Sequence, residues 1–423
     1  MLGVKLQLTM MFASILVSFF FCCGAGDPGV EDKSSLSFND LNDSPKELDS
    51  STSADKFKRT NTYASDSEGA IIKTDGLIAK SHLLNHGITA NSHNVEGDLP
   101  VGYVKNGTVD YTRYLQAALR KYNNVVFPGF PILINDSGLT IGSNTVVTFL
   151  KGSEIWLKSS SKKSYNILNL REASNVTLYN PVIKGDRYSH LGKDGEFGMG
   201  IAIRGGKNIK IFNPKITECW GDGIYIGQTN EDRVSKDILI VGAYLARNRR
   251  DGISIISVDG LVLDKLYAGY QNGTKPMCGI NFEPNNSDCE IKNVKIINPK
   301  TEYNNGSGLQ IVLSNLFAAN NAKSVDIDII NHSDLSSKSF AFKTACNNRA
   351  NVPGGVVKGS IKVLNPRWSE TIGDRPLAFV TDQANLNLTV ISPKIIKSNG
   401  VQLTSGGIKA VLNKHSNGNL KIL

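Results

Sequence analysis

Residues 208–226 read NIKIFNPKITECWGDGIYI, and this stretch contains three short patterns that recur along the chain. The first pattern, at 208–211, is a polar residue followed by alternating apolar positions, which is typical of a β-strand. The second is the pair Asn213-Pro214, which begins five residues after the start of the first pattern. The third, at 223–226, is a glycine followed by alternating apolar residues.

All three patterns return at a regular distance. The strand-like segments start at Asn175, Asn208, Asn293, Ser360 and Asn387. Five residues later come pairs with proline that begin at Asn180, Asn213, Asn298, Asn365 and Ser392. The repeated glycines are Gly200, Gly223, Gly252, Gly279 and Gly308, at spacings of 23, 29, 27 and 29 residues. A unit of this length with short strands and no helical pattern cannot close its own core, so the units must stack as coils. We therefore predict an all-β protein built as a parallel β-helix.

The corners and the ends of such a stack have their own requirements. Glycine and asparagine at the corners are expected to adopt the left-handed backbone that sharp bends require. Because an open end would expose strand edges and apolar surface, a cap is expected at each terminus. Within residues 111–122, one helical face is apolar and consists of Tyr114, Leu115, Ala118 and Leu119, which predicts an N-terminal capping helix.

The first residues have the pattern of an export signal. Lys5 provides a positive charge, and residues 6–21 form an apolar run that is short for a membrane span. Small residues up to Ala25 allow cleavage there, so residues 1–25 are predicted to be a signal peptide. We therefore expect a secreted protein, or a periplasmic or cell-surface one.

Two features follow the apolar run. Acylation of Cys22 or Cys23 is an alternative to simple cleavage, and the chain would contact a membrane only through such a lipid anchor. Residues 26–97 include a long stretch rich in Ser, Asp, Asn and Lys with few aromatic residues, which predicts a disordered or irregular linker. The β-helix domain is assigned to residues 98–423.

Charge and cysteine content narrow the function classes. The formal charge is +9, but the basic residues are scattered and no nucleic-acid motif accompanies them. An acidic polysaccharide is therefore the expected partner, and nucleic acid is not. The cysteines beyond the signal are Cys219, Cys278, Cys289 and Cys346, and their irregular spacing predicts neither a zinc site nor a disulfide framework.

The position before each repeated glycine should form a column, because neighbouring parallel strands lie about 4.8 Å apart. This column reads Met199, Asp222, Asp251, Cys278 and Ser307. Its two carboxyl groups would then lie on adjacent coils, as a glycosidase needs for its general acid and its base or nucleophile. Like charges at this distance would raise one pKa and keep that group protonated. The structural alternative is that both aspartates bond backbone amides at tight corners.

Residues 98–423 resemble the pectate-lyase-like superfamily of right-handed parallel β-helix proteins, which includes pectate lyases, polygalacturonases, epimerases and phage tailspike depolymerases. The opening is similar at Asp110-Tyr111-Thr112, Phe127-Pro128 and Ser143-Asn144-Thr145. The middle is similar at Gly185-Asp186-Arg187, His190, Glu196, residues 220–225, residues 249–254 and Glu283-Pro284-Asn285. The resemblance implies a right-handed coil and a polysaccharide substrate.

Polygalacturonases carry aspartates at this same glycine-preceding position on consecutive coils. The resemblance therefore implies that Asp222 and Asp251 are catalytic. The chain departs from those enzymes further on, because it has Cys278-Gly279 and Ser307-Gly308 where they have Gly-His-Gly and Arg-Ile-Lys.

Several other residues are predicted to contact the substrate. Arginines can grip acidic sugars with two hydrogen bonds, and one aromatic residue lies in the outward strip Ala202, Tyr225, Ser254, Asn281 and Gln310. The predicted substrate-binding residues are Asp186, Arg187, His190, Glu196, Tyr225, Arg250, Asn281 and Glu283. Glu283 shares the next outward column with Arg204, roughly 16 Å along the strand from the aspartates, which predicts a role at a neighbouring subsite.

Three functions remain open from the sequence. The leading one is a glycoside hydrolase that needs no metal or cofactor and acts on an extracellular, acidic polysaccharide. The second is a lyase for a uronic-acid polymer, in which Arg187, His190 or Arg250 removes a proton and Asp186 and Asp222 are possible Ca²⁺ ligands. The third is a non-catalytic glycan-binding or adhesion protein, because a fold does not establish chemistry. The sequence names neither the polymer nor the oligomeric state.

Overall fold

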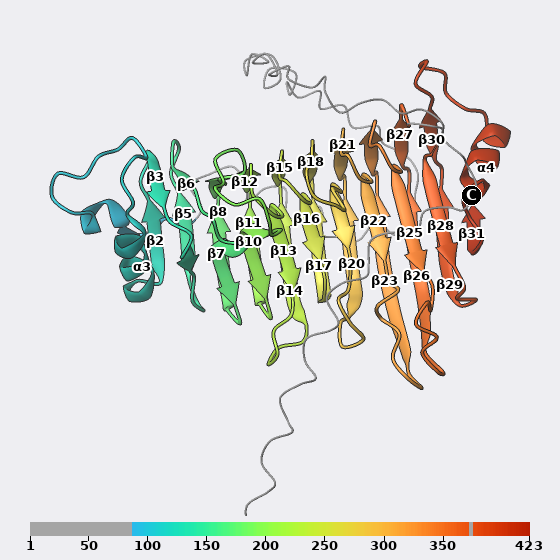
Figure 1. Cartoon of the computed structure of the whole chain (residues 1–423), viewed down its shortest axis with the longest axis horizontal. Coiled ribbons are helices and arrows are strands. Elements are labelled where there is room, and N and C mark those ends of the chain that lie inside the picture. Colours follow the sequence, from blue (N-terminus) through green and yellow to red (C-terminus); the bar gives the residue numbers. More distant parts are fainter. Residues whose placement is uncertain (1–86, 372–374) are drawn as a thin grey trace, which may run out of the picture. The chain divides into compact units, whose positions relative to one another are not determined.

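The computed structural model describes residues 87–371 and 375–423, all within one compact unit that spans residues 72–423. The predicted signal peptide and residues 26–86 of the predicted linker lie outside the described residues. Among the described residues, strands form three parallel sheets that run side by side along one axis (Figure 1). The predicted all-β parallel β-helix is confirmed.

Each full coil contributes one strand to each sheet, in the order A, B, C. The 12 strands of sheet A are β1 (His93–Asn94), β2 (Asn124–Phe127), β5 (Val146–Phe149), β8 (Ser174–Tyr179), β11 (Lys207–Phe212), β14 (Ser235–Val241), β17 (Val258–Asp264), β20 (Ile291–Ile297), β23 (Ala322–Ile330), β26 (Val356–Leu364), β29 (Leu386–Ile391) and β31 (Asn419–Ile422). The 10 strands of sheet B are β3 (Pro131–Ile134), β6 (Glu154–Leu157), β9 (Val182–Lys184), β12 (Lys215–Thr217), β15 (Tyr244–Ala246), β18 (Tyr267–Gly269), β21 (Lys300–Glu302), β24 (Ser333–Leu335), β27 (Arg367–Ser369) and β30 (Lys394–Ile396). The nine strands of sheet C are β4 (Leu139–Thr140), β7 (Ser164–Arg171), β10 (Phe197–Arg204), β13 (Ile224–Gly227), β16 (Ile253–Ile255), β19 (Ile280–Phe282), β22 (Leu309–Val312), β25 (Phe342–Cys346) and β28 (Leu377–Thr381).

The core is a set of ladders along the axis. In sheet A, one ladder runs through Leu178, Ile211, Ile240, Leu263 and Ile296, which pair in register from coil to coil and are fully buried. Each such side chain contributes roughly 1.5–3 kcal/mol of hydrophobic stabilisation. The alternation seen in the sequence therefore produces the inward face of the coil.

The corners confirm the prediction for asparagine and correct it for the repeated glycines. The residues before the recurring prolines have φ between 52° and 53°, which is the left-handed region: Asn180, Asn213, Asn298, Asn365 and Ser392. The glycine column does not adopt positive φ. Instead, a Cβ on Gly200, Gly223, Gly252 or Gly279 would lie 2.5–2.7 Å from the carbonyl oxygen of the glycine on the next coil. Close approach of successive coils, and not backbone conformation, requires glycine there.

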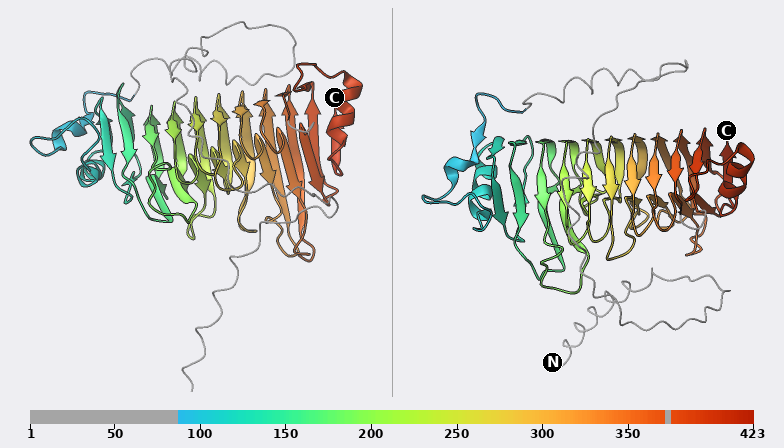
Figure 2. Two further views of the ribbon diagram at one scale, coloured as in Figure 1. Left: turned by 45° about the horizontal axis from the view of Figure 1, so that its top comes forward. Right: turned by 90° about the horizontal axis from the view of Figure 1, so that it is seen from above.

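Helices lie at both ends of the stack (Figure 2). The predicted N-terminal helix is α3 (Thr112–Lys121), which buries Leu115, Ala118 and Leu119. At the other end, α4 (Ser405–Asn413) buries Ile408 and Leu412. Before α3, strand β1 already pairs with β2, and a short 3-10 helix (Val95–Asp98) follows it. Ordered structure therefore includes the last residues of the predicted linker.

Candidate functional site

The predicted column before the repeated glycines is a ladder of hydrogen bonds. Met199 Sδ accepts a hydrogen bond from the backbone N–H of Asp222 at 3.4 Å, and Asp222 Oδ1 accepts one from the N–H of Asp251 at 3.1 Å. Asp251 Oδ1 accepts one from Cys278 at 2.6 Å, and Cys278 Sγ accepts one from Ser307 at 3.4 Å. Each acceptor side chain thus binds the amide of the next coil, as the structural alternative for the aspartates predicts.

The two aspartates lie on adjacent coils as expected, but they do not face an open cleft. Asp222 and Asp251 are both 0% exposed. The second oxygen of Asp251 accepts hydrogen bonds from Ser254 Oγ at 3.0 Å and Asn281 Nδ2 at 3.1 Å. The outward strip that contains Ser254 and Asn281 is itself buried, and Arg250 pairs with Asp222 and Glu283 beside it. A polysaccharide at the surface therefore cannot touch either aspartate in this structure.

Arg250 is the centre of a cluster of four carboxyl groups. Its Nη1 lies 3.1 Å from Asp222 Oδ2 and 3.6 Å from Asp251 Oδ2. Its Nη2 lies 3.1 Å from Glu283 Oε2, and its Nε lies 3.6 Å from Glu196 Oε2. The Arg250 side chain is 11% exposed, whereas those of Glu196 and Glu283 are 37% and 36% exposed. The cluster therefore joins two buried carboxyl groups to two that reach solvent.

Burial dominates the titration of the inner carboxyl groups. It raises the pKa of Asp251 to about 7, although the Arg250 guanidinium acts in the opposite direction. The pKa of Asp222 is raised for the same reason. Burial alone would lower the pKa of Arg250, but the carboxylates of Asp222 and Asp251 hold it above its usual value. The guanidinium thus stays charged, and near neutrality the inner pair holds a proton for part of the time.

The predicted distance between Glu283 and the two aspartates was too long. Spacing along the strand placed it roughly 16 Å from the aspartates, yet Glu283 and Asp222 bind the same guanidinium. Asn281 Nδ2 also joins Asp251 to Glu283, with both contacts at 3.1 Å. The error arose because spacing along the strand locates only the Cα atoms, whereas the carboxyl groups extend from them to the same guanidinium.

Asp186 and His190 form a second buried group, beside Trp220. Asp186 accepts hydrogen bonds from the backbone N–H of Ser160, from the hydroxyl of Tyr165 and from His190 Nδ1, the last at 2.8 Å. The His190 ring stacks on Trp220 with centroids 3.9 Å apart. Its Nε2 is buried and has no hydrogen-bond partner among the residues that the structure describes. These residues hold the loop before β10 and present no side-chain surface from His190 or Asp186.

Arg187 and Arg249 have structural partners as well. Arg187 donates hydrogen bonds to the carbonyl oxygens of Arg247 and Asn248 and to the side chain of Asn272. Arg249 stacks on Trp220 and donates to the carbonyl oxygen of Gly195. Arg187 therefore makes contacts between coils, and its predicted contact with substrate stays a prediction.

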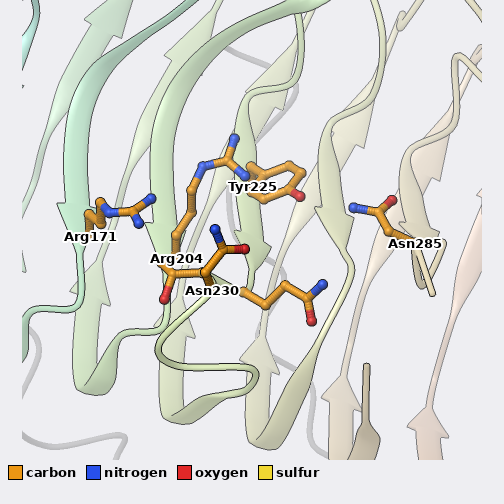
Figure 3. Close-up of a pocket in the computed structure, with 7 residues that line it drawn as sticks. Arg171, Arg204, Tyr225, Asn230 and Asn285 are labelled. Atoms are coloured by element: carbon orange, nitrogen blue, oxygen red, sulfur yellow. The ribbon is translucent and has the colours of Figure 1, made fainter. Parts of the chain in front are cut away.

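Tyr225 lines a polar pocket on the outer face of sheet C. The pocket has a volume of about 320 Å³ and is lined by Arg171, Arg204, Tyr225, Gln228, Thr229, Asn230 and Asn285. Figure 3 shows the guanidinium of Arg204 beside the Tyr225 ring. Tyr225 pairs in register with Ser254 on the next strand, so the pocket adjoins the Arg250 cluster.

The described residues contain no group of three or more His, Cys, Asp or Glu side chains arranged to hold a metal ion. In particular, Asp186 and Asp222, the proposed Ca²⁺ ligands, are engaged in separate hydrogen-bond networks. No helix within residues 87–371 and 375–423 combines the length and the apolar character that crossing a membrane requires.

Comparison with known proteins gives similarity in sequence over part of the chain and in structure over most of it. No family model matches. The protein YclG of Bacillus subtilis is 27% identical over 213 residues, which is 43% of this chain and only 36% of YclG. The tailspike protein gp49 of Acinetobacter baumannii bacteriophage Fri1, a capsular polysaccharide depolymerase, matches with a TM-score of 0.50 and 11% identity over 79% of this chain and 63% of its own. The A-module of the mannuronan C-5 epimerase AlgE4 of Azotobacter vinelandii gives 0.51 and 15% identity over 78% of this chain and 95% of its own.

These neighbours are right-handed β-helix proteins of the pectate-lyase-like kind. At such low identity, the likeness of this chain to its neighbours establishes the fold alone. Its site must therefore be argued from its own residues.

Sequence reasoning missed two parts of this site. It treated Arg250 as one substrate contact among several, although the cluster is built around this residue. It also noted Arg204 only as a column neighbour of Glu283, named Asn285 only within a motif of the resemblance, and did not identify Arg171. The register rule places Arg171 and Arg204 side by side, so an outward column of two arginines was a signal available in the sequence.

Proposed function

We propose that the chain is a glycoside hydrolase acting on an extracellular, acidic polysaccharide, with Glu196 and Glu283 as its reacting carboxyl groups. The observation that carries this proposal is that both glutamates reach solvent while binding one largely buried guanidinium. Because both contacting oxygens are so close to Arg250, they can be no more than roughly 9 Å apart, within the range that glycosidases use.

The roles follow from the contacts of each group. Arg250 Nη2 and Asn281 Nδ2 both donate to one oxygen of Glu283, which suits the carboxylate that activates water or attacks the anomeric carbon. Among the described residues, Arg250 is the one cation at ion-pair distance from Glu196, at 3.6 Å, and we assign Glu196 as the acid that protonates the leaving oxygen. As the bond between the anomeric carbon and that oxygen breaks, the proton of Glu196 passes to the oxygen. A water molecule then adds its hydroxyl group to the anomeric carbon, and its other proton passes to the carboxylate that acts as base.

Asp222 and Asp251 are positioning residues in this proposal. They pair with Arg250 on its buried side, and because they are fully buried they cannot touch a sugar. Arg250 in turn fixes the distance between Glu196 and Glu283. The similarity in fold to a capsular polysaccharide depolymerase and to a mannuronan epimerase is consistent with a polysaccharide ligand.

The test is an assay of the full chain on a panel of acidic and neutral polysaccharides, with release of reducing ends as the measurement. Glu283→Gln and Glu196→Gln should each lower the rate by about 100-fold or more. The matched control is Glu154→Gln on β6 of sheet B, which should leave the rate unchanged.

Product chemistry separates the other functions. Products with an unsaturated sugar, detected by ultraviolet absorbance, would indicate a lyase instead. Binding without any product would indicate a glycan-binding protein. If both glutamate variants cut the polymer as fast as the parent chain, the assignment of Glu196 and Glu283 is wrong.

A further inference from the structure

The pocket beside Tyr225 contains the guanidinium of Arg204, which has no carboxylate partner among the described residues. Arg204 is half-buried at the end of β10, and its guanidinium lies 3.9 Å from the centroid of the Tyr225 ring. Within the described part of the chain, no carboxylate lies at ion-pair distance from this guanidinium. Arg171, by contrast, has Glu231 at 3.3 Å and Glu172 at 3.5 Å.

The backbone is adapted to hold Arg204 in this position. Gly227 is its register partner on β13, and a Cβ on Gly227 would lie 2.5 Å from Cε1 of Tyr225. The absence of that Cβ lets the tyrosine ring lie along the strand, where it supports the guanidinium. A stacked guanidinium of this kind is oriented before any ligand arrives, so less conformational freedom is lost on binding.

The remaining lining is polar. Arg171 is the direct neighbour of Arg204 on the adjacent strand, and its own charge is compensated by Glu172 and Glu231. Arg204 is therefore the cation of this pocket that can bind an anion from solution. Asn230 and Asn285 contribute amide groups to the same pocket (Figure 3). Arginine binds planar oxyanions through two parallel hydrogen bonds.

We propose that this pocket is the subsite for an anionic substituent of the polysaccharide, a carboxylate or a sulfate ester, with Arg204 as its main ligand. The inference rests on the proposed function, because it names the substrate class of the same surface. Arg204 and Glu283 belong to one outward column and are separated by three coils, or roughly 14 Å. A polymer lying along the axis of the β-helix can therefore place its charged group at Arg204 and a sugar linkage over the Arg250 cluster.

The experiment measures binding, so that it does not depend on turnover. The parent is the full chain carrying Glu283→Gln, titrated by calorimetry with polygalacturonate and with its carboxyl-reduced form. Arg204→Gln in this background should weaken binding of polygalacturonate by about 10-fold or more, and should leave the weak binding of the reduced polymer unchanged. The matched control Arg367→Gln, an exposed arginine on β27 of sheet B, should change the dissociation constant by less than about two-fold.

A second pair of variants tests the orientation of the guanidinium. Tyr225→Leu should weaken polygalacturonate binding by roughly three-fold to 10-fold, because Arg204 loses its stacking partner. Tyr225→Phe keeps the ring and should bind as the parent does. Thermal unfolding of each variant checks that the fold is intact.

Dextran sulfate and uncharged dextran distinguish the two anions. Arg204-dependent binding of polygalacturonate identifies a carboxylate subsite, and Arg204-dependent binding of dextran sulfate identifies a sulfate subsite; either result supports the inference. It is overturned if Arg204→Gln binds both polyanions as tightly as the parent, or if the parent does not prefer charged polymers. Arg204-dependent binding by a wild-type chain that cuts nothing would refute the hydrolase and leave this subsite standing.

Discussion

Asp251 and Asp334 are both buried aspartates whose pKa is raised to about 7 by burial, yet their surroundings differ completely. Asp251 lies 3.6 Å from Arg250, which is also bound by glutamates that reach solvent. Asp334 lies inside the coil under sheet B, where it accepts hydrogen bonds from the hydroxyl groups of Thr301 at 2.6 Å and Ser337 at 2.7 Å.

The network around Asp334 continues into the core. Thr301 Oγ1 lies 2.9 Å from His332 Nε2, and Trp368 Nε1 donates to His332 Nδ1 at 3.2 Å. Burial lowers the pKa of His332 to about 3, so the ring is neutral. With Nδ1 accepting from the indole, the proton of His332 is on Nε2.

The comparison teaches that a perturbed pKa alone does not identify a functional site. Burial raises the pKa of both Asp334 and Asp251. Only Asp251 is linked, through Arg250, to charged groups at the surface. A fixed charge and a path to solvent, in addition to the shift, distinguish the candidate site from a structural network.

The largest effect is expected when the positive charge of Arg250 is removed. Arg250→Met leaves Asp222 and Asp251 buried without a counter-charge, so the free energy of unfolding should fall by about 3–5 kcal/mol at pH 7. The loss should be smaller at pH 5, because the carboxyl groups can then take up protons. Urea denaturation at both pH values measures it. Arg367→Met is the control, and equal losses at the two pH values would contradict the cluster.

Asp251 and Asp334 should both make the free energy of unfolding depend on pH. Only Asp251 should also affect the pH dependence of polymer cleavage. A folded pKa near 7, against about 3.9 when unfolded, means that the stabilising contribution is fully present below pH 4 and is lost as the pH rises through 7. Asp251→Asn and Asp334→Asn should each flatten this fall in the free energy of unfolding, by up to about 4 kcal/mol.

Denaturation between pH 4 and pH 8 measures these slopes. Only Asp251→Asn should alter the pH profile of polymer cleavage, because only that residue contacts Arg250. A changed pH profile of polymer cleavage in Asp334→Asn would show that the buried network of Asp334, Thr301 and His332 takes part in function.

Thr301→Val tests the buried network around Asp334 directly. The change keeps the shape of the side chain but removes the hydroxyl that joins His332 to Asp334, which should lower the free energy of unfolding by about 1–3 kcal/mol. Binding and cleavage of a polymer should not change. Thr177→Val on the outer face of sheet A is the matched control. Weaker polymer binding by the Thr301 variant would remove the distinction between the two regions.

The smallest effect is expected at the edge of the Arg250 cluster. Gln310 Nε2 donates to Asn281 Oδ1 at 3.2 Å and so helps to hold the amide that joins Asp251 to Glu283. Gln310→Ala should lower the free energy of unfolding by about 1 kcal/mol and the cleavage rate by less than about 10-fold. Paired denaturation and rate measurements check this. A loss as large as that of Glu283→Gln would mean that Gln310 itself touches the substrate.

The fold could be predicted closely because the register of a β-helix repeats with the sequence. Asparagines before proline marked the corners, and the column through Asp222 and Asp251 was located correctly on adjacent coils. The surroundings of that column could not be predicted. Spacing along a strand gives the position of a Cα atom, but not the direction of a side chain as long as that of Arg250.

The sequence by itself determined the coil, its corners, its apolar interior and which residues share a column, since each follows from periodicity and short-range backbone preference. Only the tertiary structure decided which carboxyl groups face solvent. Arg250 lies over two buried aspartates and between two exposed glutamates, because its own side chain crosses from one coil to the next. Exposure and charge pairing depend on groups brought together from several coils, and no repeat pattern within one coil encodes them.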